Sequence, residues 1–290
     1  MSTMRSIIRT LLLLIAAFSI QETLARDSGS CPSGFPRVVS LSPDSTEILA
    51  EFIPPACFIG VDANSNYPSE IAAVPRIGDF YSVNLEYLHS LDFDIISAGN
   101  SFNGIFLEKL KKSYPDILIL KLDTLNSVLS SIENAGMRLG MENRAQSRSE
   151  ELRKIIQDTE ARFRNSSRIR VLPVIWQKPL IAAAAGTYIN ELMSLCGAEN
   201  IITGTPVKYP EVGIEDLIAG NADIVINFAG AGMHIPPGLN IKEYTFPDQD
   251  LVMRSTPRSI TEGLTELCRI IETARTEKEN KISRPRESGR

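Results

Sequence analysis

Two aromatic residues and two glutamates stand at matching positions in the two halves of the chain. Phe80 precedes Glu86 in the first half, and Tyr209 precedes Glu215 in the second. An aromatic face can pack on a flat apolar surface, and a carboxylate attracts a cationic partner. These residue types therefore suit the binding of a ligand and of a charged partner.

The sequence around these residues repeats without a gap. Residues 80–96 read FYSVNLEYLHSLDFDII, and residues 209–225 read YPEVGIEDLIAGNADIV. Each window predicts an aromatic loop, a short helix, a turn and a strand. Two equivalent lobes that meet at a cleft would explain why the aromatic and the glutamate recur, because core packing requires neither. In the alternative interpretation the aromatics fill the core and the glutamates only complement helix dipoles, worth about 0.3–1 kcal/mol each.

Little in the chain points to catalysis or to a metal site. His89 and His234 are the only histidines. We expect His89 to be a packed or surface residue, whereas His234 lies in a loop from which an axial bond to cobalt or iron is an alternative. Zinc and manganese sites need several histidine and carboxylate ligands, and the sequence has neither a Gly-x-Ser-x-Gly motif nor a phosphate-binding loop. We therefore predict no enzyme activity, no cofactor and no protein-bound metal.

The charge pattern bears on possible partners. The net charge is −5, and acidic and basic residues are interspersed. Nucleic-acid-binding proteins usually carry a basic stripe with interleaved aromatics. Because the sequence has no such stripe, we expect no nucleic-acid partner, and we expect a monomer.

Strands alternate with helices along both halves of the chain. Short apolar strands are expected at residues 38–41, 58–61, 94–97 and 117–120, and again at 169–175 and 224–227. Ser42 and Pro43 are typical of a helix start, with Glu47 available for a capping box. The alternation predicts an α/β fold of two lobes, each with a mainly parallel sheet covered by helices, joined by one long backbone helix.

That long helix divides the chain into its expected domains. Residues 142–166 carry many charges, no glycine or proline, and a narrow apolar stripe, as in a long surface helix. We expect an N-terminal lobe over residues 36–141 and a C-terminal lobe over residues 167–275. The charged residues 276–290 are expected to be a disordered tail.

The N-terminus has the pattern of a signal peptide. Arg5 and Arg9 precede an apolar stretch at residues 11–20, which is shorter than the ~20 residues that span a bilayer. A cleavage site after Ala25 fits the small-residue rule, so residues 1–25 are predicted to be removed on export to the periplasm. An N-terminal membrane anchor is the alternative.

The cysteine count suggests disulfides in an exported protein. The chain has four cysteines: Cys31, Cys57, Cys196 and Cys268. An even number in an oxidising compartment is typical of disulfide pairs, and four cysteines allow three connectivities. We favour Cys31–Cys57 with Cys196–Cys268, because each bridge then stays within one half of the chain.

Several stretches of this sequence resemble a known family. They are VVSLSPDSTEIL, IGVDANSNYP, VNLEYLHSLDFDII, ELMSLCGAENII, YPEVGIEDLIAGNADIV and RSTPRS. Together they resemble the periplasmic binding proteins that capture vitamin B12, siderophores and haem for ABC importers, over residues 37–271. The SLSP, SNYP and CGAENI segments, the last followed by YPEV, are most similar to the cobalamin-binding members.

The resemblance implies roles for particular residues. Glu86 and Glu215 would dock onto arginines of the transmembrane permease subunits of an importer, and Phe80 and Tyr209 would pack on the ligand. The pair Cys196–Cys268 matches a disulfide of the cobalamin-binding members, whereas Cys31–Cys57 has no counterpart there. The long central helix would limit how far the two lobes close.

The expected ligand pocket departs from the family pattern at two positions. Cobalamin binders carry aromatics where this chain has Asn64 and Gly99. Tyr67 and Tyr81 lie nearby and could substitute. The predicted ligand-binding set is therefore Phe80, Tyr209, Tyr67, Tyr81, Asn64 and Asp250, and the expected ligand is cobalamin, another corrinoid or another large metal chelate.

Two other functions remain as alternatives. A ferric siderophore or haem binder of the same family is the first. Siderophores are anionic, so a basic cleft would be expected, and its candidate residues are Arg76, Lys208, Arg254 and Arg258. An exported chelatase-like enzyme of the same architecture is the second, and it would need a catalytic histidine or glutamate in the cleft.

Overall fold

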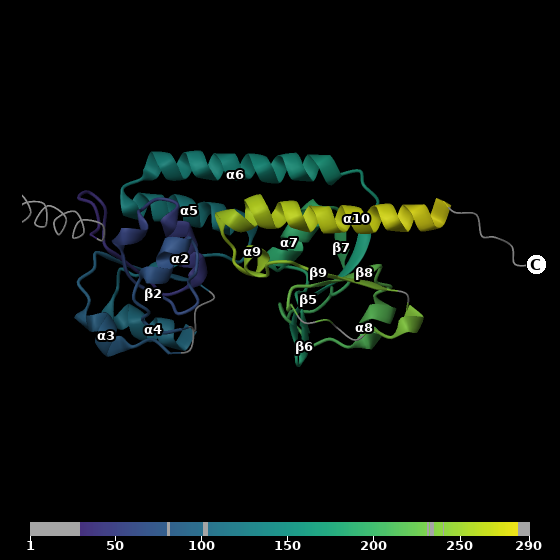
Figure 1. The fold of residues 1–290 in the computed structure, drawn as a ribbon, viewed down its shortest axis with the longest axis horizontal. Coiled ribbons are helices and arrows are strands. Elements are labelled where there is room, and N and C mark those ends of the chain that lie inside the picture. Colours follow the sequence, from purple (N-terminus) through teal and green to yellow (C-terminus); the bar gives the residue numbers. More distant parts are fainter. Residues whose placement is uncertain are drawn as a thin grey trace, which may run out of the picture.

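The molecule is elongated, with two sheets side by side along three long helices (Figure 1). The structure is a computed structural model, and it describes residues 30–79, 82–100, 104–230, 232, 235–239 and 241–283. The predicted signal peptide, Phe80, Tyr81 and His234 lie outside these described residues. The long helices are α5 (Leu125–Leu139), α6 (Glu142–Phe163) and α10 (Leu264–Ser283). Within the described ranges, no helix combines the length and apolar character that a membrane crossing requires.

The first sheet forms the N-terminal lobe and is entirely parallel. Its order is β2 (Phe58–Val61), β1 (Val38–Ser40), β3 (Ile95–Gly99) and β4 (Leu118–Leu120). The strands are connected by α2 (Pro43–Ala50), η1 (Pro55–Cys57), η2 (Ser69–Ala73), α3 (Leu85–Ser90) and α4 (Gly104–Ser113). Val38 joins one apolar core and Val39 another, because successive strand residues point to opposite faces. Burial of both faces accounts for the apolar runs in the sequence.

The second sheet forms the C-terminal lobe. Its path is β6 (Leu180–Ala182), β5 (Ile169–Gln177), β8 (Ile224–Asn227) and β9 (Lys242–Thr245), and β7 (Ala198–Asn200) also pairs with β5. Of the strand pairs in this sheet that the described residues form, β5–β6 is antiparallel and the other three are parallel. The other elements are α7 (Tyr188–Leu195), α8 (Ile214–Ala219), η3 (Pro237–Leu239), α9 (Asp250–Met253) and the short π-helix η4 (Ser259–Gly263). The predicted fold of two mainly parallel, helix-covered lobes is therefore confirmed.

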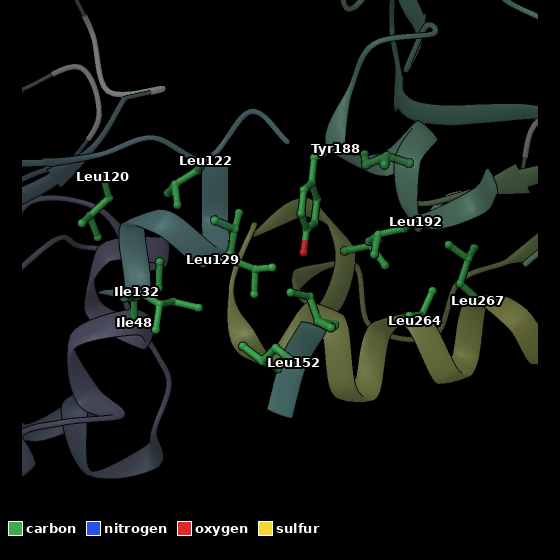
Figure 2. Close-up of a cluster of buried hydrophobic side chains, with 14 of the residues drawn as sticks. Ile48, Leu120, Leu122, Leu129, Ile132, Leu152, Tyr188, Leu192, Leu264 and Leu267 are labelled. Atoms are coloured by element: carbon green, nitrogen blue, oxygen red, sulfur yellow. The ribbon is translucent and has the colours of Figure 1, made fainter. Parts of the chain in front are cut away.

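The two lobes share one apolar core along α5, α6 and α10 (Figure 2). Helix α6 lies against α5, where Ser149 is fully buried and donates to the Leu129 carbonyl at 3.0 Å. The cluster in Figure 2 draws side chains from both lobes and from these helices: Ile48, Leu120, Leu122, Leu129, Ile132, Leu152, Tyr188, Leu192, Leu264 and Leu267. Moving one lobe relative to the other would therefore expose part of this shared core, which costs free energy.

Helix α10 corrects the prediction of a disordered tail. The helix continues to Ser283, so that prediction is wrong for residues 276–283, while residues 284–290 lie outside the described part of the chain. Tail charges that suggested disorder instead pair with the C-terminal lobe. Lys278, for example, donates to Asp223 at 2.7 Å. Composition alone does not reveal such a partner, because the partner comes from a distant part of the chain.

Both disulfides have the pairing favoured by the sequence. Cys31 is bonded to Cys57, which joins the segment before β1 to the start of β2. Cys196 is bonded to Cys268, which joins the end of α7 to α10. Each bridge stays within its own lobe.

Candidate functional site

The two repeated windows fold as equivalent units. The first contains α3 followed by β3, and the second contains α8 followed by β8. Leu88 and Leu217 are fully buried at matching positions and anchor the two short helices. The aspartates before the strands also match, since Asp94 accepts from the backbone amide of Arg37 at 2.7 Å and Asp223 accepts from that of Arg170 at 2.8 Å. The repeat therefore extends to hydrogen bonds that packing alone does not require.

The two glutamates of the repeat are exposed at helix starts. Glu86 is in the first turn of α3, whose N-cap Asn84 accepts from the amide of Tyr87 at 2.9 Å. Glu215 is in the first turn of α8, where Asp216 accepts from the amide of Gly213 at 2.8 Å. Figure 1 shows α3 and α8 along the same edge of the molecule, one in each lobe, opposite α6. The structure thus places the two helices that carry these exposed glutamates on one edge, one from each lobe.

Tyr209 lies on a segment that pairs with the edge of the second sheet. The amides of Ala182 and Ala184 donate to the carbonyls of Pro210 and Lys208 at 3.1 and 2.9 Å. Tyr209 itself is 48% exposed. Its neighbour Lys208 reaches the other lobe, where its Nζ lies 2.6 Å from the Asp123 carboxylate. Tyr209 therefore stands beside a contact between the lobes.

A second contact between the lobes contains three of the predicted ligand residues. Asn64 and Tyr67 belong to the loop that follows β2, and Asp250 begins α9. The side-chain amide of Asn66 in the same loop donates to the Asp250 carboxylate at 3.3 Å. Tyr67 is 39% exposed, and the guanidinium of Arg258 stacks over its ring at 4.4 Å. Tertiary structure thus brings Asn64, Tyr67 and Asp250 together from two lobes.

A buried ion pair stands behind this contact. Glu47 in α2 is 3% exposed and lies 2.7 Å from Arg254, which is 11% exposed and directly follows α9. The hydroxyl of Thr256 also donates to Glu47, at 3.0 Å. Burial raises the pKa of Glu47, and the contacts with Arg254 and Thr256 oppose that shift.

Glu47 does not cap its own helix as the sequence suggested. The side chain of Ser42 caps α2 by accepting from the amide of Ser45. The carboxylate of Glu47 turns instead toward Arg254, because the helix places it at the lobe interface. The prediction of a capping box through Glu47 was wrong for this reason.

The chain has Gly99 where cobalamin binders were expected to carry an aromatic residue, and the Asp44 carboxylate lies beside this glycine. A Cβ at this position would lie 2.8 Å from both carboxylate oxygens of Asp44, closer than non-bonded carbon and oxygen atoms approach. The Gly99 amide also donates to the hydroxyl of Ser42 at 2.9 Å. Burial raises the pKa of Asp44. A side chain at position 99 would therefore require the Asp44 carboxylate to move from its hydrogen bonds with Ser42 and Ser45.

Each residue of the predicted basic lining already has partners within the chain. Arg76 donates to the carbonyls of Asp62 and Ser65. The other three form ion pairs: Lys208 with Asp123, Arg254 with Glu47 and Asp250, and Arg258 with Asp248 and Glu262. An anionic ligand would have to compete with these partners, so the basic cleft expected for a siderophore is largely neutralised.

Other features of the described residues contribute little to this site. His89 is exposed on α3, and its ring lies 5.6 Å from that of Tyr114. Across the ranges that the structure describes, no group of three or more histidine, cysteine, aspartate and glutamate side chains could hold a metal ion. A groove of about 610 Å³ between α6 and α10 contains none of the predicted ligand residues.

Two mainly parallel α/β lobes joined by a long helix define the architecture of a two-lobed binding protein. Residues 38–234 match the family model described as periplasmic binding protein. This match spans more than half of the chain, and the protein belongs to that family. Its members are solute-binding proteins, as the sequence resemblance predicted.

Relatives of this chain are described as vitamin B12-binding or haem-binding proteins. The vitamin B12-binding protein of Vibrio parahaemolyticus serotype O3:K6 is 25% identical over 249 residues, which cover 82% of this chain and 90% of that protein. The vitamin B12-binding protein of Pectobacterium carotovorum is 28% identical over 235 residues, which cover 77% of this chain and 83% of that protein.

Solved structures share the fold. The periplasmic vitamin B12-binding protein of Vibrio cholerae has a TM-score of 0.72 at 24% identity, covering 84% of this chain and 99% of that one. A periplasmic haem-binding protein from Roseiflexus has a TM-score of 0.69 at 19% identity, covering 82% and 98%. The fold is therefore common to proteins with different ligands, and the ligand must be argued from the site.

Proposed function

We propose that this protein is an extracytoplasmic solute-binding protein that delivers cobalamin or another corrinoid to an ABC importer. The choice of an uncharged ligand is supported mainly by the pairing of the candidate basic residues with partners in this chain. Cyanocobalamin has no net charge, whereas siderophores and the propionates of haem are anionic and would favour unpaired cations. Arg254 and Lys208, the residues best placed between the lobes, are both held by carboxylates of this chain. The names of the vitamin B12-binding relatives support the same choice.

The proposed pocket combines aromatic faces with a few polar groups. Tyr67 and Tyr209 are exposed on different lobes, and aromatic rings pack well on a large flat ring system. Phe80 and Tyr81 complete the proposed aromatic set. Asn64 and Asp250 offer hydrogen-bonding groups that suit the amide-rich rim of a corrinoid, and such groups orient a ligand in a mainly apolar site.

Docking is proposed to use Glu86 and Glu215. Both carboxylates are exposed in first helical turns, and the helices lie on one edge of the molecule (Figure 1). A permease that presents a cationic patch to each lobe would contact both at once. Binding and release then need no chemical step, so the proposal assigns neither a catalytic residue nor a cofactor. The periplasmic relatives support export. We propose that export uses the signal peptide at residues 1–25 and that the mature protein is a monomer.

Ligand titration tests this proposal. Purified mature protein is titrated with cyanocobalamin, with haemin and with a ferric siderophore, with detection by calorimetry and by the fluorescence of Trp176, the only tryptophan. We expect a dissociation constant for cyanocobalamin of about 1 μM or lower, equivalent to about −8 kcal/mol. Tighter binding of haemin or of the siderophore would refute the corrinoid assignment.

A further inference from the structure

The loop that follows β2 is held by both lobes. Within its own lobe, Arg76 donates to the carbonyls of Asp62 and Ser65 at 3.2 and 2.6 Å. The hydroxyl of Ser65 also bonds that of Thr46 in α2 at 2.9 Å. These contacts fix the base of the loop but not its outer residues, which include Tyr67.

Arg254, in the C-terminal lobe, forms hydrogen bonds with the outer part of the loop. Its guanidinium donates to the side-chain oxygen of Asn66 at 2.7 Å and to the backbone carbonyl of Asn64 at 3.1 Å. The same group is fixed from behind by Glu47 at 2.7 Å and by Asp250 at 2.8 Å. A planar guanidinium can satisfy several acceptors in a fixed geometry, which a single ammonium group cannot.

The contacts that Arg254 makes with Glu47 and with the loop depend on the distance between the two lobes. Glu47 and Arg254 are 207 residues apart in sequence and belong to different lobes. Separating the lobes here would leave a buried carboxylate without its cation, and breaking such a pair is costly. The position of the outer part of the loop therefore depends on the position of the C-terminal lobe relative to the N-terminal lobe.

We infer that Arg254 is a positioning residue. It holds the loop of residues 62–68 in place across the lobe interface, and so fixes the side of the proposed pocket, here called the ligand edge, that carries Asn64 and Tyr67. This inference rests on the proposed function, because it makes a ligand-binding loop depend on lobe spacing. Arg254 acts through the loop and need not touch the ligand. The Glu47 carboxylate orients the guanidinium, so both members of the pair contribute.

The substitution Arg254→Lys tests the inference. Lysine keeps a positive charge near Glu47 but loses the fork that reaches Asn64 and Asn66 together. Arg148→Lys is the matched control: Arg148 pairs with Glu51 at the end of α2, at 3.0 Å, and with Glu151 on α6 at 2.8 Å, both away from the loop. If Arg254→Lys fails to fold, Glu47→Gln combined with Arg254→Met removes the pair without leaving a buried charge.

Two measurements on the purified mature protein test the inference: hydrogen exchange and ligand affinity. Hydrogen exchange of the ligand-free protein is followed at the amide of Asn64, which donates to the Asp62 carboxylate and belongs to the residue whose carbonyl accepts from Arg254. Arg254→Lys should speed this exchange about tenfold or more and weaken cyanocobalamin binding about tenfold, as expected for lost hydrogen bonds to a charged group. Arg148→Lys should change neither.

The results separate this inference from the proposed function. Unchanged loop exchange in Arg254→Lys overturns the inference whatever the ligand is. Faster exchange with unchanged ligand affinity also overturns it, because the loop would then not set the ligand edge. Equal effects of Arg148→Lys would show general loosening and refute a specific role. Failure of the wild-type protein to bind cyanocobalamin refutes the corrinoid proposal. The comparison of hydrogen exchange still tests whether Arg254 holds the loop in place.

Discussion

Replacing Glu86 and Glu215 together by alanine removes the two carboxylates proposed to meet the importer. Both are exposed in first helical turns, so the folded protein should lose no more than the dipole interaction, about 0.3–1 kcal/mol per residue. In a complex, each carboxylate would form a charge-assisted hydrogen bond worth about 1.5–3 kcal/mol. The sites lie on separate lobes, so the losses should add to about 3–6 kcal/mol, or about a hundred- to ten-thousandfold weaker docking.

The assay measures two affinities on the same protein. Binding of the ligand-loaded protein to the reconstituted importer is followed by surface plasmon resonance, and cyanocobalamin binding is followed by calorimetry. We expect docking to fall by the amount above and to weaken further with salt, because screening acts strongly on exposed charges. Ligand affinity should stay within about twofold, since the substituted side chains lie on α3 and α8 rather than in the proposed pocket.

A charge-matched control separates docking from net charge. Glu150 and Glu160 are exposed on α6, which lies along the opposite edge of the molecule (Figure 1). Substituting both by alanine removes the same charge and should leave docking unchanged. If the Glu86 and Glu215 double variant docks like the wild type, or if the α6 variant loses docking equally, the assignment of these glutamates is refuted.

Three further predictions concern stability. Gly99→Ala should lower the free energy of unfolding by about 1–3 kcal/mol through overpacking against Asp44, and equal stability in urea titrations would contradict the predicted clash. Removing the Cys196–Cys268 bridge by serine substitution should cost about 2–5 kcal/mol; an unchanged midpoint of thermal unfolding would show that the bridge is dispensable. Because burial raises the folded-state pKa of Asp44 above its ordinary value of 3.8, the stabilising contribution of Asp44 should be lost as pH rises from 3.8 through the raised value, which adds a falling component to that part of the curve of wild-type stability against pH. Asp44→Asn should flatten that part of the curve, and identical pH profiles would rule this cause out.

The internal repeat could be predicted from sequence because its causes are local. Leu88 and Leu217 recur at the same place in each window, and both prove fully buried. The strands follow in the same register, with Asp94 and Asp223 accepting equivalent backbone amides. Helical and strand periodicities act over a few residues, so a single sequence is enough to reveal them.

The partners of charged residues could not be predicted in the same way. Arg275 is the last residue of the predicted C-terminal lobe, directly before the charged residues expected to form a tail, and it is 4% exposed. It donates to the carbonyls of Ser167 and Cys196, both at 2.8 Å, and so ties α10 to the end of α7. Glu47 likewise resembled a helix cap and proved to face Arg254. Each pairing depends on contacts between segments far apart in the chain.

The sequence by itself determined the alternation of strands and helices, the two matching units around Glu86 and Glu215, and the presence of enough cysteines for two bridges. These features follow from local periodicity and residue type. Tertiary structure decided that the Asp44 carboxylate lies where a side chain at position 99 would begin, and that the cations near the lobe interface are already paired. It also decided that Arg254 joins the lobes at the loop bearing Asn64. The physical reason is that steric space and charge pairing depend on which distant segments are folded together.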